Sequence, residues 1–296
     1  MSATIRGELQ NDGRAHRRSI LVGSPIRQRP QILEAFLGGL TAQFSGSLDL
    51  TFVFVDDNDD QHSKELLKSF REGVQNVILA DVDPGERYVC DDSRTHVWKE
   101  SLIWRVAAMK DVIIDHALET EADYLFLVDS DIVLRPGTIE HLASLDLDVV
   151  SEVFWTKWTP ESLELPQVWL YDVYDMVRRG RSEQLDELEA VRRRNQFIEM
   201  LRRPGVYPVG GLGACTLISR SAMERGVRFR EIPNLQFWGE DRHFCIRAAA
   251  LEIGLWADTH LPPLHLYRES DLQRLPDFEG GASARILHTH SVSVQP

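Results

Sequence analysis

The chain has 296 residues, of which 43% are hydrophobic and 27% charged, and its formal net charge at pH 7 is -13. This length allows one large domain or two smaller ones, and the composition is that of an ordinary soluble globular protein. The negative charge excludes sequence-independent binding to nucleic acids or to anionic lipid surfaces.

Three cysteines, Cys90, Cys215 and Cys245, are scattered along the chain without a CxxC pair. This spacing argues against a zinc knuckle and against a disulfide framework. The sequence contains no N-terminal apolar signal region and no apolar run long enough to span a bilayer. We therefore expect a cytoplasmic protein without an integral membrane segment. The sequence leaves a homo-oligomeric state open.

The first part of the chain alternates predicted strands and helices. Residues 1–17 read as a loose leader. Strands are predicted within 18–25, 48–57, 74–82 and 124–128, and helices within 30–44, 63–73 and 98–119. Such alternation predicts an α/β fold with a mostly parallel sheet and helices on both faces. Ligands of these sheets bind beyond the carboxyl ends of the strands, which here carry Pro25–Arg29, Asp56 with Asp57, and Asp129 with Asp131.

The pattern changes after Pro136. A further strand is predicted at 146–154, and an aromatic, irregular segment begins at Trp155. The apolar spacing of 182–203 predicts a helix with Ser182 as its N-cap. A glycine turn leads into a strand within 205–224, and 237–270 predicts a helix, a strand and a loop that carries a histidine. Residues 271–296 read as a tail or a wrapping arm.

The first chemical motif is Asp129-Ser130-Asp131, which follows five apolar residues. Residues i and i+2 of an extended segment point the same way, so both carboxylates can face one ligand. A solvated turn explains an isolated Asp-x-Asp equally well, but the preceding buried strand favours a ligand site. Mg²⁺ and Mn²⁺ prefer such oxygen ligands and keep positions open for phosphate oxygens.

Two further motifs lie near the end of the predicted domain. Glu240 and Asp241 open a helix directly after Trp238-Gly239. Acids at a helix start are often only caps or dipole partners, yet one of them could be a general base. His265 follows two prolines in a loop, and a neutral imidazole binds ions such as Mn²⁺.

Taken together in this order, the motifs resemble those of the GT-A glycosyltransferases, and especially the inverting family 2 group. The stretches that carry the resemblance are VDDNDD, LFLVDSD and WGEDRHFCIRAAALEIGLWADTHLPPLHL, and it covers about residues 18–268. It implies one compact GT-A domain over 18–270, with a nucleotide-binding half (18–135) and an acceptor half (136–270) that contains a helical insertion (155–204).

The resemblance also implies roles for individual residues. The nucleotide-binding positions are Pro25, Arg27, Asp56, Asp57, Asp129 and Ser130, with Asp56 on the base, most often uracil. The metal ligands are Asp131, Asp129 and His265, and the ion is Mn²⁺ or Mg²⁺. The catalytic base is Asp241, or alternatively Glu240, and Trp238 and Gly239 face the acceptor.

Each of three further positions has two possible roles. Arg105 and Lys110 flank the apolar stripe of their helix, so each either reaches the diphosphate or forms a salt bridge. Gly211 either lets backbone N–H groups approach the donor or belongs to a plain tight turn. The aromatic residues of the insertion, among them Trp158 and Trp169, either stack on an acceptor or pack in the core.

The implied activity is metal-assisted transfer of a sugar, with inversion, from a nucleotide-sugar donor, preferably a UDP-sugar, to a hydroxyl acceptor of unknown class. The chain departs from the family in having Asn58-Asp59-Asp60 after the first acids, and in the insertion. Four alternatives are a retaining GT-A enzyme, a nucleotidyltransferase, a non-catalytic nucleotide- or carbohydrate-binding relative, and a metallohydrolase. GSPIRQRP has too few glycines for the second, and the sequence has no HExxH motif for the last.

Overall fold

The computed structural model describes residues 17–82, 85, 89–91, 95–236 and 239–280. Its helices are α1 (Pro30–Thr41), α2 (Gln61–Gly73), α3 (Glu100–Glu119), α4 (Thr138–Ser144), α5 (Glu187–Leu201), α6 (Arg220–Glu224), α7 (Glu240–Ala250) and the 3-10 helix η1 (Glu269–Arg274). The strands of the large sheet are β1 (Arg18–Ile26), β2 (Leu48–Asp56), β3 (Val77–Asp81), β6 (Tyr124–Val128), β8 (Val149–Glu152), β12 (Val206–Val209), β14 (Cys215–Ser219) and β15 (Leu255–Asp258). The remaining strands form short pairs: β4 (Val89–Asp91) with β5 (Thr95–Val97), β7 (Ile132–Val133) with β16 (Leu264–His265), β9 (Trp155–Thr156) with β10 (Leu165–Pro166), and β11 (Val168–Trp169) with β13 (Gly211–Leu212).

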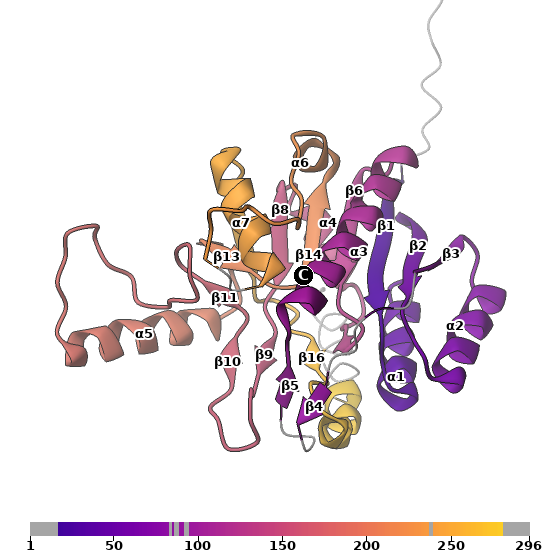
Figure 1. Ribbon diagram of the computed structural model, residues 1–296, viewed down its shortest axis with the longest axis horizontal. Coiled ribbons are helices and arrows are strands. Elements are labelled where there is room, and N and C mark those ends of the chain that lie inside the picture. Colours follow the sequence, from indigo (N-terminus) through magenta and orange to yellow (C-terminus); the bar gives the residue numbers. More distant parts are fainter. Residues whose placement is uncertain (1–16, 83–84, 86–88, 92–94, 237–238, 281–296) are drawn as a thin grey trace, which may run out of the picture.

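The eight-stranded sheet has the order β12-β15-β8-β14-β6-β1-β2-β3 (Figure 1). Neighbours are parallel from β6 to β3 and between β15 and β8. Strand β14 runs antiparallel to both of its neighbours, and β12 runs antiparallel to β15. The predicted α/β class with a mostly parallel sheet is confirmed, whereas the reversal of β14 was not predicted.

Helices cover both faces of this sheet, as the continuous apolar character of its strands predicts. On one face, α3, α6 and α7 pack against side chains such as Val53 and Leu125. On the other face, α1, α2 and α4 pack against side chains such as Phe52 and Phe126. Successive residues of one strand thus contribute to different cores because their side chains alternate between the faces.

The strand ends meet at one edge of the sheet. Ile26 at the end of β1 lies in register with Asp56 at the end of β2, and the backbone N–H of Asp57 donates to the carbonyl of Ile26 (2.9 Å). Strand β6 ends beside them at Val128. The three candidate strand ends therefore converge, as the topology of a parallel sheet requires.

A short antiparallel pair joins two distant parts of the chain next to this edge. His265 in β16 lies in register with Ile132 in β7, and the N–H of Leu266 donates to the carbonyl of Asp131 (2.8 Å). This pairing holds the chain that follows β15 against the turn that follows β6.

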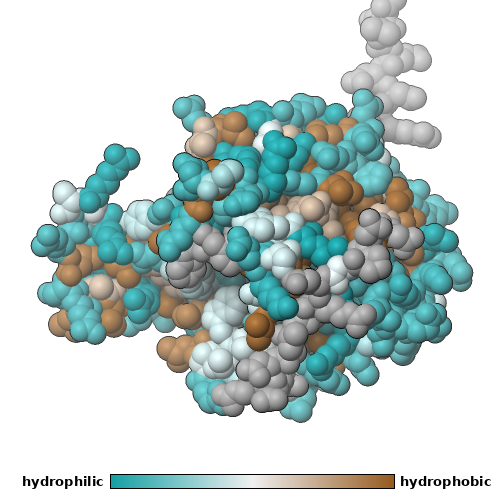
Figure 2. Space-filling model, in the orientation of Figure 1, coloured by the Kyte–Doolittle hydropathy of each residue, from teal (hydrophilic) through white to brown (hydrophobic). Residues whose placement is uncertain are grey.

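The insertion forms an arm that projects from the sheet (Figure 1). Its helix, α5, begins at Glu187 instead of the predicted Ser182, and its N-cap is Asp186, whose carboxylate accepts from the N–H of Glu189 (2.7 Å). Only the C-terminal part of α5 reaches the core, so Leu188 is 81% exposed. Figure 2 accordingly shows apolar side chains on this arm, within an otherwise largely hydrophilic face.

The described part of the predicted tail is folded. Residues 269–274 form η1, and 275–280 are helical. Leu272, Leu275 and Phe278 pack against a small core that contains Ile32 of α1 and Leu266. This segment thus packs beside α1 up to residue 280. No helix in the described ranges is both long and apolar enough to cross a membrane.

Candidate active site

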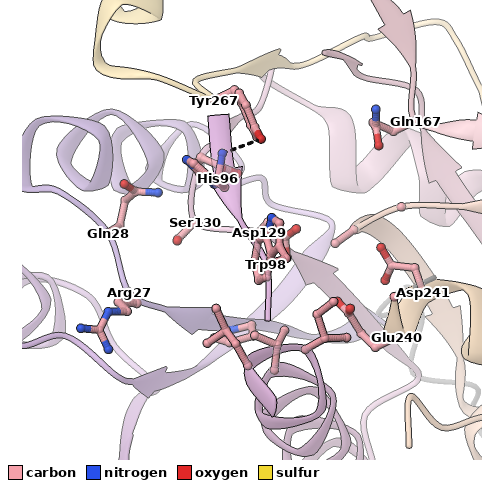
Figure 3. A pocket seen from close by; sticks show the side chains of 18 of the residues that line it. Arg27, Gln28, His96, Trp98, Asp129, Ser130, Gln167, Glu240, Asp241 and Tyr267 are labelled. Carbon is pink, nitrogen blue, oxygen red and sulfur yellow. Dashed lines mark hydrogen bonds between the residues drawn. The ribbon is translucent and has the colours of Figure 1, made fainter. Parts of the chain in front are cut away.

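A cavity of about 390 Å³ opens at the carboxyl ends of β1, β2 and β6. The predicted residues that line it are Pro25, Arg27, Asp57, Asp129, Ser130, Asp131, Gly239, Glu240, Asp241 and His265. In Figure 3, Arg27 and Gln28 lie on one side of the cavity and Glu240 and Asp241 on the opposite side, with Asp129 and Ser130 between them. The cavity thus has two chemically distinct ends.

Asp131 and His265 come together in the wall of this cavity, as the sequence motifs predict. Nε2 of His265 lies 3.4 Å from Oδ2 of Asp131, and Nδ1 of His265 contacts the Thr156 hydroxyl (2.8 Å). Burial acts to raise the pKa of Asp131, but the nearby imidazoles of His265 and His96 hold it below its usual value. Oδ1 of Asp131 is buried without a hydrogen-bond partner among the described residues.

The second imidazole, His96, was not among the predicted site residues. Its ring stacks on Tyr267 with 4.4 Å between ring centroids, and its backbone N–H donates to the Tyr267 hydroxyl (3.1 Å; Figure 3). Burial lowers the pKa of His96, although the charge of Asp131 opposes this shift. A lone histidine without a recognisable spacing gave no signal in the sequence.

The opposite end of the cavity is organised by Lys110 of α3. Its side chain is 1% exposed, and Nζ lies 2.8 Å from Glu240 Oε1, 3.1 Å from Asp241 Oδ1 and 3.9 Å from Asp129 Oδ1. Burial acts to lower the pKa of Lys110, but the charges of Asp241, Glu240 and Asp129 raise it well above its usual value. Lys110 therefore remains protonated and takes the salt-bridged role of the two that the sequence left open.

One ammonium group does not fully offset three carboxylates. Burial raises the pKa of Asp241, and the charge of Lys110 opposes this shift. The charge of Glu240 also raises this pKa, which reaches about 6. Burial likewise raises the pKa of Asp129 to about 7, again opposed by Lys110. Side chains of this kind exchange protons near neutral pH. Asp129 thus faces Lys110 as well as the cavity, where 44% of its side chain is exposed.

The acids after β2 form ion pairs and hydrogen bonds within the protein. Arg105 binds Asp57 through its Nη2 (2.7 Å), and Arg27 approaches the same carboxylate at 3.6 Å. Asp56 accepts hydrogen bonds from the backbone N–H and the side chain of Asn58, whose own oxygen accepts from the N–H of Gln28 (2.8 Å). These contacts fix the loops that shape this side of the cavity.

Gly211 and Gly239 have different surroundings. A Cβ on Gly211 would lie 1.9 Å from the indole of Trp169, so this glycine allows close packing between β13 and β11. Gly213 lines the cavity in its place. Gly239 also lines the cavity, and its φ of 102° favours glycine. Trp238 lies outside the described residues, so its predicted contact with an acceptor stays a prediction.

Several aromatic and polar residues complete the cavity without having been predicted there. They are Trp98, Gln167 and Tyr267, whereas Gln28 belongs to the predicted strand end Pro25–Arg29. Among the aromatic residues of the insertion, Trp158 lines the cavity and is 40% exposed, whereas Trp169 is buried in the core. Trp169 therefore packs in the core, and the stacking of Trp158 on an acceptor stays a prediction.

Solved structures of other proteins share the fold described above. No family model matches the chain. A glycosyltransferase 25 family member from Aedes aegypti is 27% identical over 138 residues, which are 45% of this chain and 22% of that protein. Among solved structures, S. aureus TarS 1-349 in complex with UDP-GlcNAc superposes with a TM-score of 0.51 and 13% identity, and covers 83% of this chain and 57% of that one. The complex of the same TarS fragment with UDP also has a TM-score of 0.51 and 13% identity, and covers 83% and 59%.

The chain therefore shares its fold with TarS while it spans less than two thirds of each of these proteins.

Proposed function

We propose that the protein is a glycosyltransferase that moves a sugar from a nucleotide-diphosphate donor, preferably a UDP-sugar, to an acceptor hydroxyl with inversion. The observation that carries this proposal is the meeting of Asp131 and His265 in one cavity wall, with Glu240 and Asp241 lining the same cavity. The matched protein from A. aegypti is named as a glycosyltransferase, and the TarS complexes hold UDP-GlcNAc and UDP. Both support a nucleotide-sugar donor.

The nucleotide would bind on the side of the cavity formed by β1 and β2. Pro25, Arg27 and Gln28 line this side, and Arg27 brings a guanidinium close to the site where phosphates would lie. Asp57 is already paired with Arg105, so it positions these arginines. Asp56 is held by Asn58 in the adjoining loop, and its hydrogen bond to the base remains a proposal.

A divalent cation fits the residues at Asp131. A buried carboxylate oxygen without a partner and an imidazole nitrogen form a donor set that suits Mn²⁺ or Mg²⁺. When bound, such an ion would supply positive charge to the departing diphosphate. His265 is oriented for this role, because the Thr156 hydroxyl occupies its other ring nitrogen.

Asp241 is the better placed of the two candidate bases. Its side chain is 30% exposed, whereas that of Glu240 is 14% exposed and lies closer to Lys110. With a pKa of about 6, Asp241 is mostly ionised near pH 7 and can accept a proton. The acceptor oxygen would bond to the anomeric carbon as its proton passes to Asp241, and the sugar–phosphate bond would break with its electron pair on the nucleotide.

The acceptor would enter beside Gly239, where the backbone carries no side chain to block its approach. Trp98 and Trp158 offer exposed ring faces in the same cavity. Sugar rings commonly pack on such faces, because their C–H surfaces are apolar.

Donor binding can be tested before the acceptor is known. We expect UDP with Mn²⁺ to raise the melting temperature, because a ligand at a hundred times its dissociation constant adds about 2.7 kcal/mol of stability. The gain should disappear in Asp131→Ala and persist in the matched control Asp115→Ala, an exposed residue on α3. If UDP, GDP and dTDP all leave the melting temperature unchanged, the proposal is wrong.

Catalysis can then be followed as UDP release from a UDP-sugar. Asp241→Asn should reduce kcat about 10²–10⁴-fold while UDP still binds, because a positioned general base contributes about that factor. The anomeric configuration of the product, measured by NMR, separates inversion from retention. Retention with an unimpaired Asp241→Asn variant would point to a retaining enzyme.

A further inference from the structure

A second group of titratable side chains lies outside the active-site cavity. His141 of α4 places Nε2 3.1 Å from Oδ1 of Asp258, and His260 places Nδ1 2.8 Å from Oδ2 of the same carboxylate. The two imidazole rings are 4.9 Å apart in an edge-to-face arrangement. Asp258 ends β15 and is fully buried, while both histidines reach solvent.

A second buried carboxylate adjoins this group. Glu152 ends β8 and lies in register with Asp258 on the neighbouring parallel strand. Its Oε1 accepts from the N–H of Leu261 (2.8 Å), and its side chain hydrogen-bonds the carboxyl group of Asp258. Two buried carboxyl groups on neighbouring strands need a shared proton or a cation between them.

We propose that His141, Asp258 and His260 bind a transition-metal ion of the zinc class, with Glu152 as an outer carboxylate. The candidate ligand atoms all lie within 4.8 Å of one another. A tetrahedral zinc ion with bonds of about 2.0 Å places its ligand atoms roughly 3.3 Å apart, so small rotations of the side chains would admit it. Two imidazoles favour zinc, cobalt, nickel or copper over the harder magnesium and calcium.

The surroundings of Asp258 resemble the outer shell of such sites. The backbone N–H of His260 donates to its Oδ1 (2.9 Å), and Glu152 contacts the carboxylate from the adjacent strand. Hydrogen bonds of this kind orient a metal-binding carboxylate. The exposed side of the two histidines leaves room for water as a fourth ligand.

The location suggests what this ion does. It would join α4, the end of β15 and the loop that leads to β16. The same loop is held by Arg135, whose Nε donates to the carbonyl of Pro262 (3.1 Å), and it continues to His265. The ion is therefore structural, and it stabilises the loop that carries His265 to Asp131. This proposal stands independently of the proposed function.

The direct test is metal titration of the untagged full chain after removal of bound metal. Co²⁺ serves as the spectroscopic probe and Zn²⁺ as the ion for calorimetry. We expect one equivalent of Co²⁺ to give the visible absorption of a tetrahedral site, and Zn²⁺ to raise the melting temperature. Both should be lost in His141→Asn/His260→Asn, and Glu152→Gln should weaken binding about 10–100-fold.

Two controls separate this site from the others. His62→Asn/His116→Asn removes two histidines of α2 and α3, and Asp131→Ala disables the proposed donor site. Both should keep the Co²⁺ spectrum. The proposal is overturned if wild type binds no Co²⁺ or Zn²⁺, or if the His141/His260 double variant binds them as wild type does.

A second measurement needs no variant and so does not depend on folding. Diethyl pyrocarbonate modifies accessible imidazoles, and mass spectrometry locates the modified residues. Zn²⁺ should protect His141 and His260 together, and leave the modification of His62 unchanged. Equal modification of His141 and His260 with and without Zn²⁺ contradicts the proposal.

Discussion

Two groups of neighbouring carboxylates in this protein are neutralised in different ways. Asp129, Glu240 and Asp241 surround Lys110, whose ammonium lies at the centre of the group. Asp258 and Glu152 instead face two half-exposed histidines, and the charge of Arg135 only partly offsets the effect of burial on Glu152. The first group carries a permanent positive charge within it, whereas the second can gain one from solution.

The difference shows how a buried lysine affects the pKa of the carboxyl groups around it. Lys110 keeps Asp241 close enough to its ionised form that the carboxylate titrates near neutral pH, with a pKa of about 6. Without a lysine, Glu152 has a pKa of about 10 and holds its proton. A carboxyl side chain therefore accepts protons in one group and retains its proton in the other.

Removal of Lys110 should have the largest effect on the stability of the protein. We expect Lys110→Met to lower the free energy of unfolding by about 3–5 kcal/mol near pH 7, because it leaves buried carboxylates without their cation. This loss of stability should shrink near pH 5, because Asp241 and Asp129 are then mostly protonated. Urea unfolding at both pH values measures it, with the exposed Lys68→Met as the matched control. A loss below about 1 kcal/mol at pH 7 would contradict the central role of Lys110.

A smaller effect is expected in the other group. Asp258→Asn in metal-free protein should cost about 1–3 kcal/mol, which is the usual cost of disturbing a buried hydrogen-bonding group. The cost stays moderate because the substitution also removes the negative charge that faces Glu152. Urea unfolding in the presence of a chelator measures it. A cost larger than that of Lys110→Met would show that the two groups do not differ in the way described.

The smallest effect concerns the pH dependence of activity. The kcat/KM for UDP release should fall as the pH drops below about 6, because Asp241 must be ionised to accept a proton. Glu240→Gln removes a neighbouring negative charge and should move this limb to lower pH by up to about one unit, or about 1.4 kcal/mol. A limb that stays in place would contradict the coupling of Glu240 to Asp241, and loss of activity on the scale expected for Asp241→Asn would identify Glu240 as the base.

Much of this arrangement could be predicted from the sequence. Buried strands that end in acids predicted the convergence of Asp57, Asp129 and Asp131, because the carboxyl ends of parallel strands share one edge. The order of motifs also predicted that His265 would reach Asp131, as it does. Their roles toward a donor remain predictions.

Other features depend on contacts that spacing does not reveal. Sequence could not tell whether Lys110 faced a ligand or the acids of α7, because that depends on how α3 and α7 pack together. The sequence left Gly211 open between approach to a donor and a plain tight turn, whereas its lack of a side chain accommodates Trp169. The N-cap of α5 lies at Asp186 because its carboxylate meets a free backbone N–H there, and Ser182 precedes the helix.

The site at Asp258 gave only one signal in the sequence, the Asp-x-His spacing of Asp258 and His260. His141 lies on another helix, and nothing in its neighbourhood indicates a ligand. Glu152 occurs within a strand pattern, where a buried acid looks like an ordinary surface residue until its burial is known.

The pairing of β7 with β16 has a consequence for how the protein is made. Because His265 joins Asp131 only through β16, the ribosome must release the chain as far as β16 before the two can meet. Contacts between residues so distant in sequence form late and slowly in folding. A nascent or truncated chain that ends before β16 would carry β1, β2 and β6 but lack one wall of the cavity. The cavity would thus stay incomplete until β16 has been synthesised.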